Sequence, residues 1–303
     1  MKFSGHETFA MRYAWLPKAY SALSRDPYAL SNDEEAMVAL GIGKNMVYSL
    51  RFWIDATDVA HPIQGGGFQL TPFAKAVLDR QGFDPFLEDP KTLWLLHWNL
   101  ATRQESPLFA WHYLFNEWKL PEFTRSEVLK AFQRTSAKLG YSHSDVTLSQ
   151  HLDIFLHTYH SRKVGAREDS LDGPLVELDL LRLLGDRQND SGRWEKVYSF
   201  DRRPKPQISA ALFEFFIDDF WRRWRASEKV LTLADILHGH CSPGRVLNLP
   251  EQDLIERLDS YASSASTAPF QYRPSAIQGH LVRRRGDAGD LLSAVYEREV
   301  SYA

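Results

Sequence analysis

The stretch SNDEEAMVALGIGKNMVYSLRFWIDATDVA, residues 31–60, has the pattern of two helices joined by a tight turn. Asn32 can cap the first helix, because an Asn side chain accepts hydrogen bonds from the free N–H groups of a first turn, and the acidic residues after it suit the positive end of the helix dipole. Gly41 stands where a helix commonly ends in a left-handed residue, and a second helix is predicted from about Gly43. The spacing therefore predicts a helix-turn-helix.

The second predicted helix has an apolar side and a polar side. Apolar residues such as Leu50 and Trp53 recur at helical spacing and are expected to face the core. The other side carries Lys44, Asn45, Tyr48, Arg51 and Asp55. Lys and Arg can bridge guanine, Asn can bridge adenine, and all of these donors can hold phosphate. We therefore predict that Lys44, Asn45, Tyr48 and Arg51 bind DNA, with an ordinary amphipathic core helix as the alternative.

The next residues, HPIQGGGFQLT at 61–71, read as a short strand, a glycine-rich tip and a returning strand. A hairpin in this place has the shape of the wing that follows a helix-turn-helix. A helix predicted from about Thr8 to Leu23 would precede the pair. Residues 1–82 are thus predicted to form a winged-helix DNA-binding domain.

The rest of the chain is predicted to be largely helical. Amphipathic segments, several opened by proline, predict a helical domain over residues 83–160. Residues 161–303 include a predicted hairpin around Asp190 and a final third that repeats the opening theme, so they are expected to form an α+β region or a second winged helix. The expected fold class is mainly α with minor β: an N-terminal winged helix-turn-helix, then a helical domain with small β-hairpins.

Composition restricts the class of protein. The 303 residues include 44% hydrophobic residues, enough for two or three domains, and no apolar run approaches the length that spans a bilayer. The single cysteine, Cys241, excludes an intramolecular disulfide and a Cys-rich zinc module, which predicts a cytoplasmic protein. With a net charge of −3, nucleic-acid contacts must come from local patches, and the alternative for each basic cluster is a solvated surface. The clusters lie at residues 202–205, 222–225 and 283–285.

The pair His6 and Glu7 begins like a zinc-protease motif, but the second His which that motif needs is Ala10. The zinc-protease class is therefore excluded. A His-Glu pair can still move a proton or hold a metal, since His titrates near neutral pH and a carboxylate ligates cations. We take His6 and Glu7 as candidate catalytic residues, with a helix-entry cap as the alternative.

A second candidate site lies beyond the helical region. Glu168, Asp169 and Asp172 place three carboxylates within five residues, next to a basic loop. Hard divalent cations prefer oxygen ligands, and a bound cation stabilises charge on a phosphodiester. The segment is a candidate site for Mg²⁺ or Mn²⁺, and a solvated loop is the alternative.

Several motifs resemble a prokaryotic family formerly labelled as a domain of unknown function, the SspB-like family of DNA phosphorothioation-associated proteins. They are FSGHETF at 3–9, LGIGKNMV at 40–47, LTPF at 70–73, DPFLED at 84–89 with TLWLLHW at 92–98, and FNE at 115–117. The resemblance covers nearly the whole chain, and its first 120 residues carry the most specific motifs.

The resemblance implies a DNA-nicking component of a bacterial phosphorothioate modification and defence system. Such a protein would bind double-stranded DNA and work with a cysteine desulfurase, an ATPase and a reductase-like protein. The sequence shows no standard nuclease signature, so a non-catalytic DNA-binding adaptor that recruits the sulfur-transfer enzymes, or a regulator, stays open. Because helix-turn-helix proteins commonly bind as dimers, we also predict a homodimer.

Overall fold

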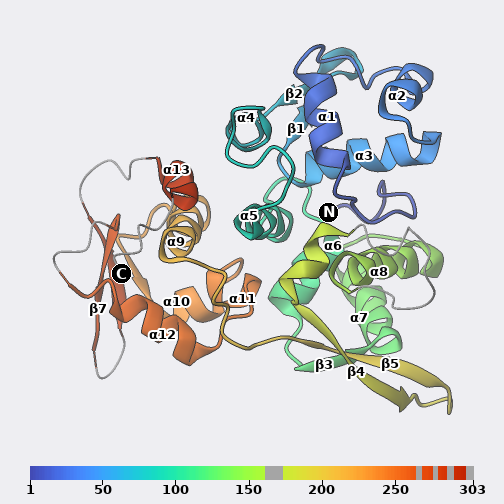
Figure 1. The fold of residues 1–303 in the computed structure, drawn as a ribbon. Helices are drawn as coiled ribbons and strands as arrows, with labels where there is room; N and C mark the ends of the chain where they lie inside the picture. Colours follow the sequence, from blue (N-terminus) through green and yellow to red (C-terminus); the bar gives the residue numbers. More distant parts are fainter. Residues whose placement is uncertain (161–172, 264–267, 276–278, 285–289, 298–303) are drawn as a thin grey trace. The chain divides into compact units, whose positions relative to one another are not determined.

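The computed structural model describes residues 1–160, 173–263, 268–275, 279–284 and 290–297. The chain forms two compact units, Met1–Asp201 and Arg202–Ala303 (Figure 1). Their described strands form one two-stranded and two three-stranded sheets, and helices make up most of the remaining regular structure. The expected class, mainly α with minor β, is confirmed. The domain ranges 1–82, 83–160 and 161–303 stay predictions.

The first unit opens with the predicted helix pair. Helix α2 covers Asp33–Leu40 and helix α3 covers Lys44–Ala56. The Asn32 side chain accepts hydrogen bonds from the amides of Glu34 and Glu35, and Gly41 ends α2 with a φ of 67°. Both the cap and the left-handed turn were expected from the sequence, and the structure confirms them.

A short hairpin follows α3. Strand β1 (Ala60–Pro62) pairs with β2 (Phe68–Leu70) in antiparallel register, around a turn at Gln64–Gly66. A Cβ on Gly67 would lie 2.8 Å from two ring atoms of Tyr28, so only glycine fits where the hairpin passes this ring. The predicted hairpin is confirmed.

The first helix is shorter than predicted, because α1 begins at Trp15 and ends at Leu23, whereas a start near Thr8 was expected. Hydrogen bonds from α3 explain the difference. The Ser49 hydroxyl donates to the His6 carbonyl at 2.9 Å, and the Trp53 indole N–H donates to the Phe9 carbonyl at 3.0 Å. These carbonyls are satisfied from another element, so the segment need not coil to satisfy them.

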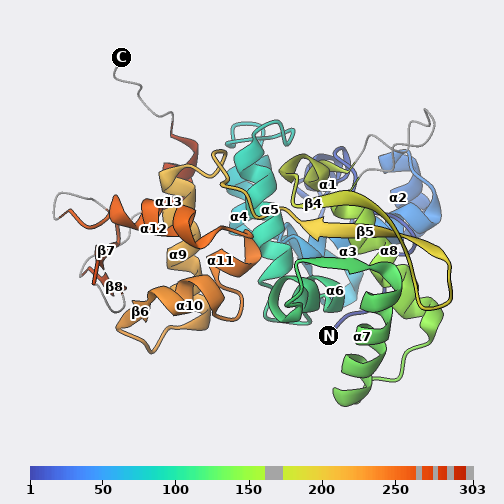
Figure 2. The same ribbon diagram turned by 90° about the horizontal axis from the view of Figure 1, so that it is seen from below.

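The remainder of the first unit is mostly helical, as predicted, but it contains an additional strand, β3, which joins the long hairpin formed by β4 and β5 in a sheet ordered β3-β5-β4. Helix α7 packs on β3 and β5, as Figures 1 and 2 show. The elements are α4 (Pro72–Leu78), α5 (Pro90–Ala101), α6 (Phe109–His112), η2 (Tyr113–Glu117), β3 (Glu122–Thr124), α7 (Arg125–Lys138), α8 (Asp145–Tyr159), η4 (Pro174–Leu178), β4 (Leu181–Gln188) and β5 (Trp194–Phe200).

The second unit is built on α9 (Ala210–Trp224), with α13 (Leu291–Tyr296) packed along it. Its three-stranded sheet has the order β6-β8-β7. The other elements are β6 (Val230–Thr232), α10 (Leu233–His238), α11 (Pro243–Val246), α12 (Glu251–Asp259), β7 (Phe270–Arg273) and β8 (His280–Arg283). Throughout the described part of the chain, every helix is too short or too polar to cross a membrane.

Candidate nucleic-acid interface

The four residues predicted to bind DNA lie on α3, but they differ in exposure. Lys44 and Asn45 are exposed in the first turn of the helix, and the Lys44 side chain is 58% exposed. Tyr48 is half-buried, and the Arg51 side chain is only 18% exposed. The first turn of α3 is therefore the part of the predicted surface that is open to a ligand.

Three of the four side chains converge on Asp33, in the first turn of α2. The Tyr48 hydroxyl donates to its carboxylate at 2.5 Å, Arg51 donates at 2.8 Å, and the Lys44 ammonium lies 3.4 Å away. These hydrogen bonds, first that of Tyr48 and then that of Arg51, lower the pKa of Asp33 to about 2. We call Asp33, Lys44, Tyr48 and Arg51 the Asp33 cluster.

Within the Asp33 cluster, Arg51 braces the helix pair. Its Nε donates to the carbonyl of Leu30 at 2.7 Å, so the guanidinium holds both the carboxylate of α2 and the segment before it. The Lys44 ammonium and the Arg51 guanidinium also lie over the Tyr48 ring, at 5.7 and 5.5 Å from its centroid. Helical periodicity places Arg51 on the polar side of α3, but it does not reveal that α2 supplies a carboxylate to that side.

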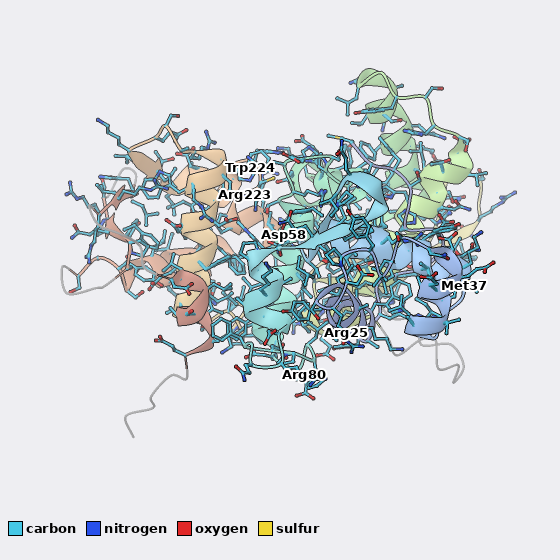
Figure 3. All side chains as sticks on the ribbon, turned by 90° about the horizontal axis from the view of Figure 1, so that it is seen from above. Arg25, Met37, Asp58, Arg80, Arg223 and Trp224 are labelled. Atoms are coloured by element: carbon cyan, nitrogen blue, oxygen red, sulfur yellow. The ribbon has the colours of Figure 1, made fainter. Side chains whose placement is uncertain are left out.

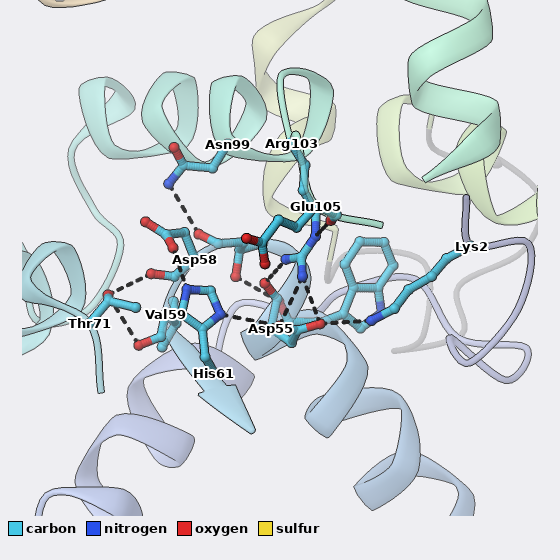
Figure 4. Close-up of polar contacts among 11 residues, drawn as sticks. Lys2, Asp55, Asp58, Val59, His61, Thr71, Asn99, Arg103 and Glu105 are labelled. Carbon is cyan, nitrogen blue, oxygen red and sulfur yellow. Dashed lines mark hydrogen bonds and ion pairs between the residues drawn. The ribbon is translucent and has the colours of Figure 1, made fainter. Parts of the chain in front are cut away.

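Asp55 belongs to the same predicted polar side, yet it is 6% exposed. The expectation that it faces solvent is wrong, because other segments fold over it (Figure 4). The Lys2 ammonium lies 2.8 Å from its carboxylate, and one Arg103 nitrogen lies 3.0 and 3.1 Å from the two oxygens. Burial raises the pKa of Asp55, but Lys2 and Arg103 outweigh it and leave the pKa below its ordinary value.

Asp55 also takes part in the contacts that connect α3 to the hairpin. The His61 ring on β1 lies 3.2 Å from Asp55 and 2.9 Å from Asp58 (Figure 4). Directly after β2, at the base of the hairpin, the Thr71 hydroxyl donates to the Asp58 carbonyl at 2.6 Å. The side-chain amide of Asn99, on α5, donates to the Thr57 carbonyl at 3.1 Å. These contacts fix the base of the hairpin against the C-terminal end of α3.

His6 lies beneath α3 rather than on the open surface, and its side chain is buried. Because the Ala110 amide donates to Nε2 of His151 at 3.0 Å, the neutral His151 ring carries its proton on Nδ1 and donates it to Nε2 of His6, also at 3.0 Å. Nδ1 of His6 then donates to the Glu7 carbonyl at 2.8 Å. Burial lowers the pKa of both rings, so both imidazoles are neutral in this hydrogen-bonded series.

Nδ1 of His6 thus donates, and Nε2, the one ring nitrogen with a lone pair, accepts from His151, so the ring has no open lone pair for a substrate in this conformation. Glu7 is exposed, with a φ of 52°, and the segment is not the helix cap that was the alternative, since α1 begins at Trp15. A catalytic role for His6 and Glu7 stays a prediction, and the geometry favours Glu7 over His6 for contact with a ligand.

The predicted metal ligands Glu168, Asp169 and Asp172 lie outside the described residues. Within the described residues of each unit taken alone, no three His, Cys, Asp or Glu side chains converge at ligand distances. The chemistry of the predicted ligands still suits a hard cation, because all three offer carboxylate oxygens.

The basic clusters are partly structural. Lys205 is 3% exposed, and Arg222 and Arg223 bind the Asp219 carboxylate at 2.7 and 2.9 Å. Figure 3 shows Arg223 and Trp224 at the end of α9 and, in the first unit, Arg25 and Arg80 at the surface beyond α1 and α4. The clusters at 202–205 and 222–225 are therefore not simply runs of free cations.

The comparisons with known proteins place this architecture. A family described as a protein of unknown function (DUF4007) matches residues 3–296. The chain belongs to this family. Its fold is SspB-like: a magnesium-bound SspB crystal structure matches with a TM-score of 0.83 and 27% identity, over 98% of this chain and 89% of that one. A second SspB crystal structure matches with a TM-score of 0.80 and 26% identity, over the same shares of the two chains. No protein of curated function matches the sequence.

Proposed function

We propose that this member of the family is the DNA-binding, DNA-nicking component of a bacterial phosphorothioate modification and defence system. The proposal rests on the likeness to SspB over 98% of the chain and on one local observation. That observation is the open first turn of α3, where Lys44 and Asn45 are exposed beside a tight turn.

In this proposal residues 31–71 act as a winged helix-turn-helix. The N-terminal residues of a recognition helix contact base edges in the major groove, and Lys44 and Asn45 occupy that place on α3. The β1–β2 hairpin is the wing, and the contacts of Asp55 and His61 hold it at a fixed angle to α3. Tyr48 and Arg51 hold α2 against α3 beneath this surface through their hydrogen bonds to Asp33.

Nicking requires a group that neutralises the phosphate and a base that activates water. Magnesium is bound in one SspB crystal structure, and we propose that Glu168, Asp169 and Asp172 would hold Mg²⁺ or Mn²⁺ in this chain. The bound cation would supply positive charge beside the scissile phosphate. Glu7 is the better placed of the two candidate bases, because it is exposed whereas His6 is engaged through both nitrogens.

The direct test is relaxation of supercoiled plasmid by the purified protein with Mg²⁺ or Mn²⁺. We expect open circles that EDTA prevents and that Asp169→Ala and Glu7→Ala abolish without loss of DNA binding. Glu251→Ala, which removes an exposed carboxylate in the second unit, is the matched control and should leave nicking unchanged. Plasmid that stays supercoiled under all conditions contradicts the nickase.

The engaged His6 ring favours a second candidate, a non-catalytic DNA-binding adaptor for the sulfur-transfer enzymes. It predicts that the protein shifts plasmid in a gel without cutting it, and that it retains a cysteine desulfurase, ATPase or reductase-like protein of the same system in a pull-down. A pull-down that retains none of the three contradicts the adaptor.

A further inference from the structure

Asp33 places a carboxylate beside Lys44 on the surface through which α3 is proposed to contact DNA. We infer that Asp33 is a specificity-determining residue: its carboxylate competes with DNA phosphate for Lys44 and so restrains sequence-independent binding. The inference rests on the proposed DNA binding and identifies the residue that limits it.

The members of the Asp33 cluster differ in how freely they can move. Arg51 is 18% exposed and is held by two acceptors, the Asp33 carboxylate and the Leu30 carbonyl. Lys44 is 58% exposed and touches Asp33 at 3.4 Å, a longer contact than that of Arg51. Since exposed ion pairs are weak, a phosphate can take Lys44 away from Asp33, whereas Arg51 stays in place.

The Asp33 carboxylate stays in place when the Lys44 side chain moves away. The Tyr48 hydroxyl at 2.5 Å and the Arg51 guanidinium at 2.8 Å keep its carboxylate in position, with 27% of the side chain exposed. A phosphate that binds Lys44 therefore has to break the ion pair between Lys44 and a carboxylate that stays in place. That competition weakens every contact that depends on phosphate alone, which is the basis of sequence-independent binding.

A base edge meets the same carboxylate differently. The amino group of cytosine is a donor in the major groove, and Asp or Glu can accept its hydrogen bond. A carboxylate that disfavours phosphate but accepts from a base thus lowers the affinity for DNA without a suitably placed cytosine more than the affinity for DNA that has one. Asp33 supplies such a repulsive element next to the attractive Lys44 and Asn45.

The test is Asp33→Asn, which removes the charge but keeps one oxygen that can accept from Arg51, while its amide N–H can donate to the Tyr48 hydroxyl. Glu34→Gln is the matched control, because it removes the same charge from the neighbouring exposed residue, whose carboxylate contacts none of the three α3 side chains in the described structure. Binding to a random-sequence duplex is measured by fluorescence anisotropy across a salt series. Asp33→Ser is a second neutral variant, and thermal unfolding reports whether each variant is folded.

We expect Asp33→Asn to bind the random duplex about fivefold more tightly at each salt concentration, because Lys44 then reaches phosphate without giving up an ion pair. Glu34→Gln should change the affinity less than about twofold, because it leaves Lys44 paired. In a Lys44→Gln background the gain from Asp33→Asn should disappear.

Two results overturn the inference. If the wild-type protein binds DNA and both folded Asp33 variants bind like Glu34→Gln, Asp33 is only a brace, and the proposed DNA binding stands without it. If the wild-type protein binds no duplex at any salt concentration, the proposed function fails and the inference fails with it.

Discussion

Asp55 gives the sharpest prediction about what holds the proposed DNA-binding surface together. Asp55→Asn leaves the Arg103 guanidinium, 15% exposed, and the Lys2 ammonium without their common charge. Removing one partner of a buried ion pair costs about 3–5 kcal/mol. We expect the lower end, about 3 kcal/mol, because Arg103 keeps the carbonyls of Asp55 and Glu105 as acceptors and Lys2, 39% exposed, can turn to water.

Native-state hydrogen exchange measures this loss locally, which matters in a chain of two compact units. Peptides from α3 and β1–β2 should exchange about a hundredfold faster in Asp55→Asn, since each 1.4 kcal/mol is about a factor of ten. Peptides from α9, in the other unit, are the internal control. Asp58→Asn is the matched variant, and its 45% exposed side chain should contribute less than about 1 kcal/mol.

The pH dependence of this effect has a defined sign. The folded pKa of Asp55 lies below its ordinary value of 3.8, so the stabilisation is complete above that value and is lost as the pH falls below it. The difference between wild type and Asp55→Asn should therefore narrow from pH 7 to pH 3. Exchange of α3 that changes less than about fivefold at neutral pH, or that rises equally in α9, refutes the reasoning about the buried pair.

Three further predictions concern other parts of the chain. His6 and His151 have lowered pKa values in the fold, so unfolding takes up protons below about pH 6.5: stability is complete above that pH and falls below it, and His151→Asn should flatten the fall seen in urea unfolding between pH 7 and pH 5. Gly41→Ala, at a φ of 67° with open space around the site, should cost about 1 kcal/mol in thermal unfolding, whereas Gly43→Ala, at a φ of −74°, should cost about half of that or less, which is the effect of alanine at the N-cap of α3; equal losses contradict the strain argument. Light scattering should give the mass of a homodimer, twice 34.9 kDa, and a monomer at all concentrations contradicts the dimer.

Local patterns predicted much of the fold. Asn32 and Gly41 are short-range signals that set the ends of α2 by contacts within one turn, and the spacing of Leu50 and Trp53 marks the buried side of α3 within a short stretch of sequence. The hairpin at 61–71 is of the same kind, because glycines at its tip allow the positive φ values that the turn needs. These elements are found where the sequence predicted them.

Tertiary contacts decided the remainder. The side chains of Ser49 and Trp53 hold the carbonyls of residues 6 and 9, so α1 begins late, and Lys2 and Arg103 reach Asp55 from distant parts of the chain. Strand β3 forms only because residues 194–200 pair with it. Periodicity reports one helix at a time, so it gives the polar side of α3 but not which other segments cover it. The buried His6–His151 pair has no signal in sequence, since its two residues lie 145 positions apart.

Binding of double-stranded DNA by the first turn of α3 is the central claim, and a salt series on Lys44→Ala tests it most directly. Lys138→Ala on α7 is the matched control, another exposed lysine that loses the same charge. We predict that wild type binds a duplex more weakly as salt rises, and that Lys44→Ala flattens the slope by about 0.9 and weakens binding about tenfold while Lys138→Ala matches wild type. Absence of salt-dependent binding, or an equal loss in both lysine variants, contradicts the claim.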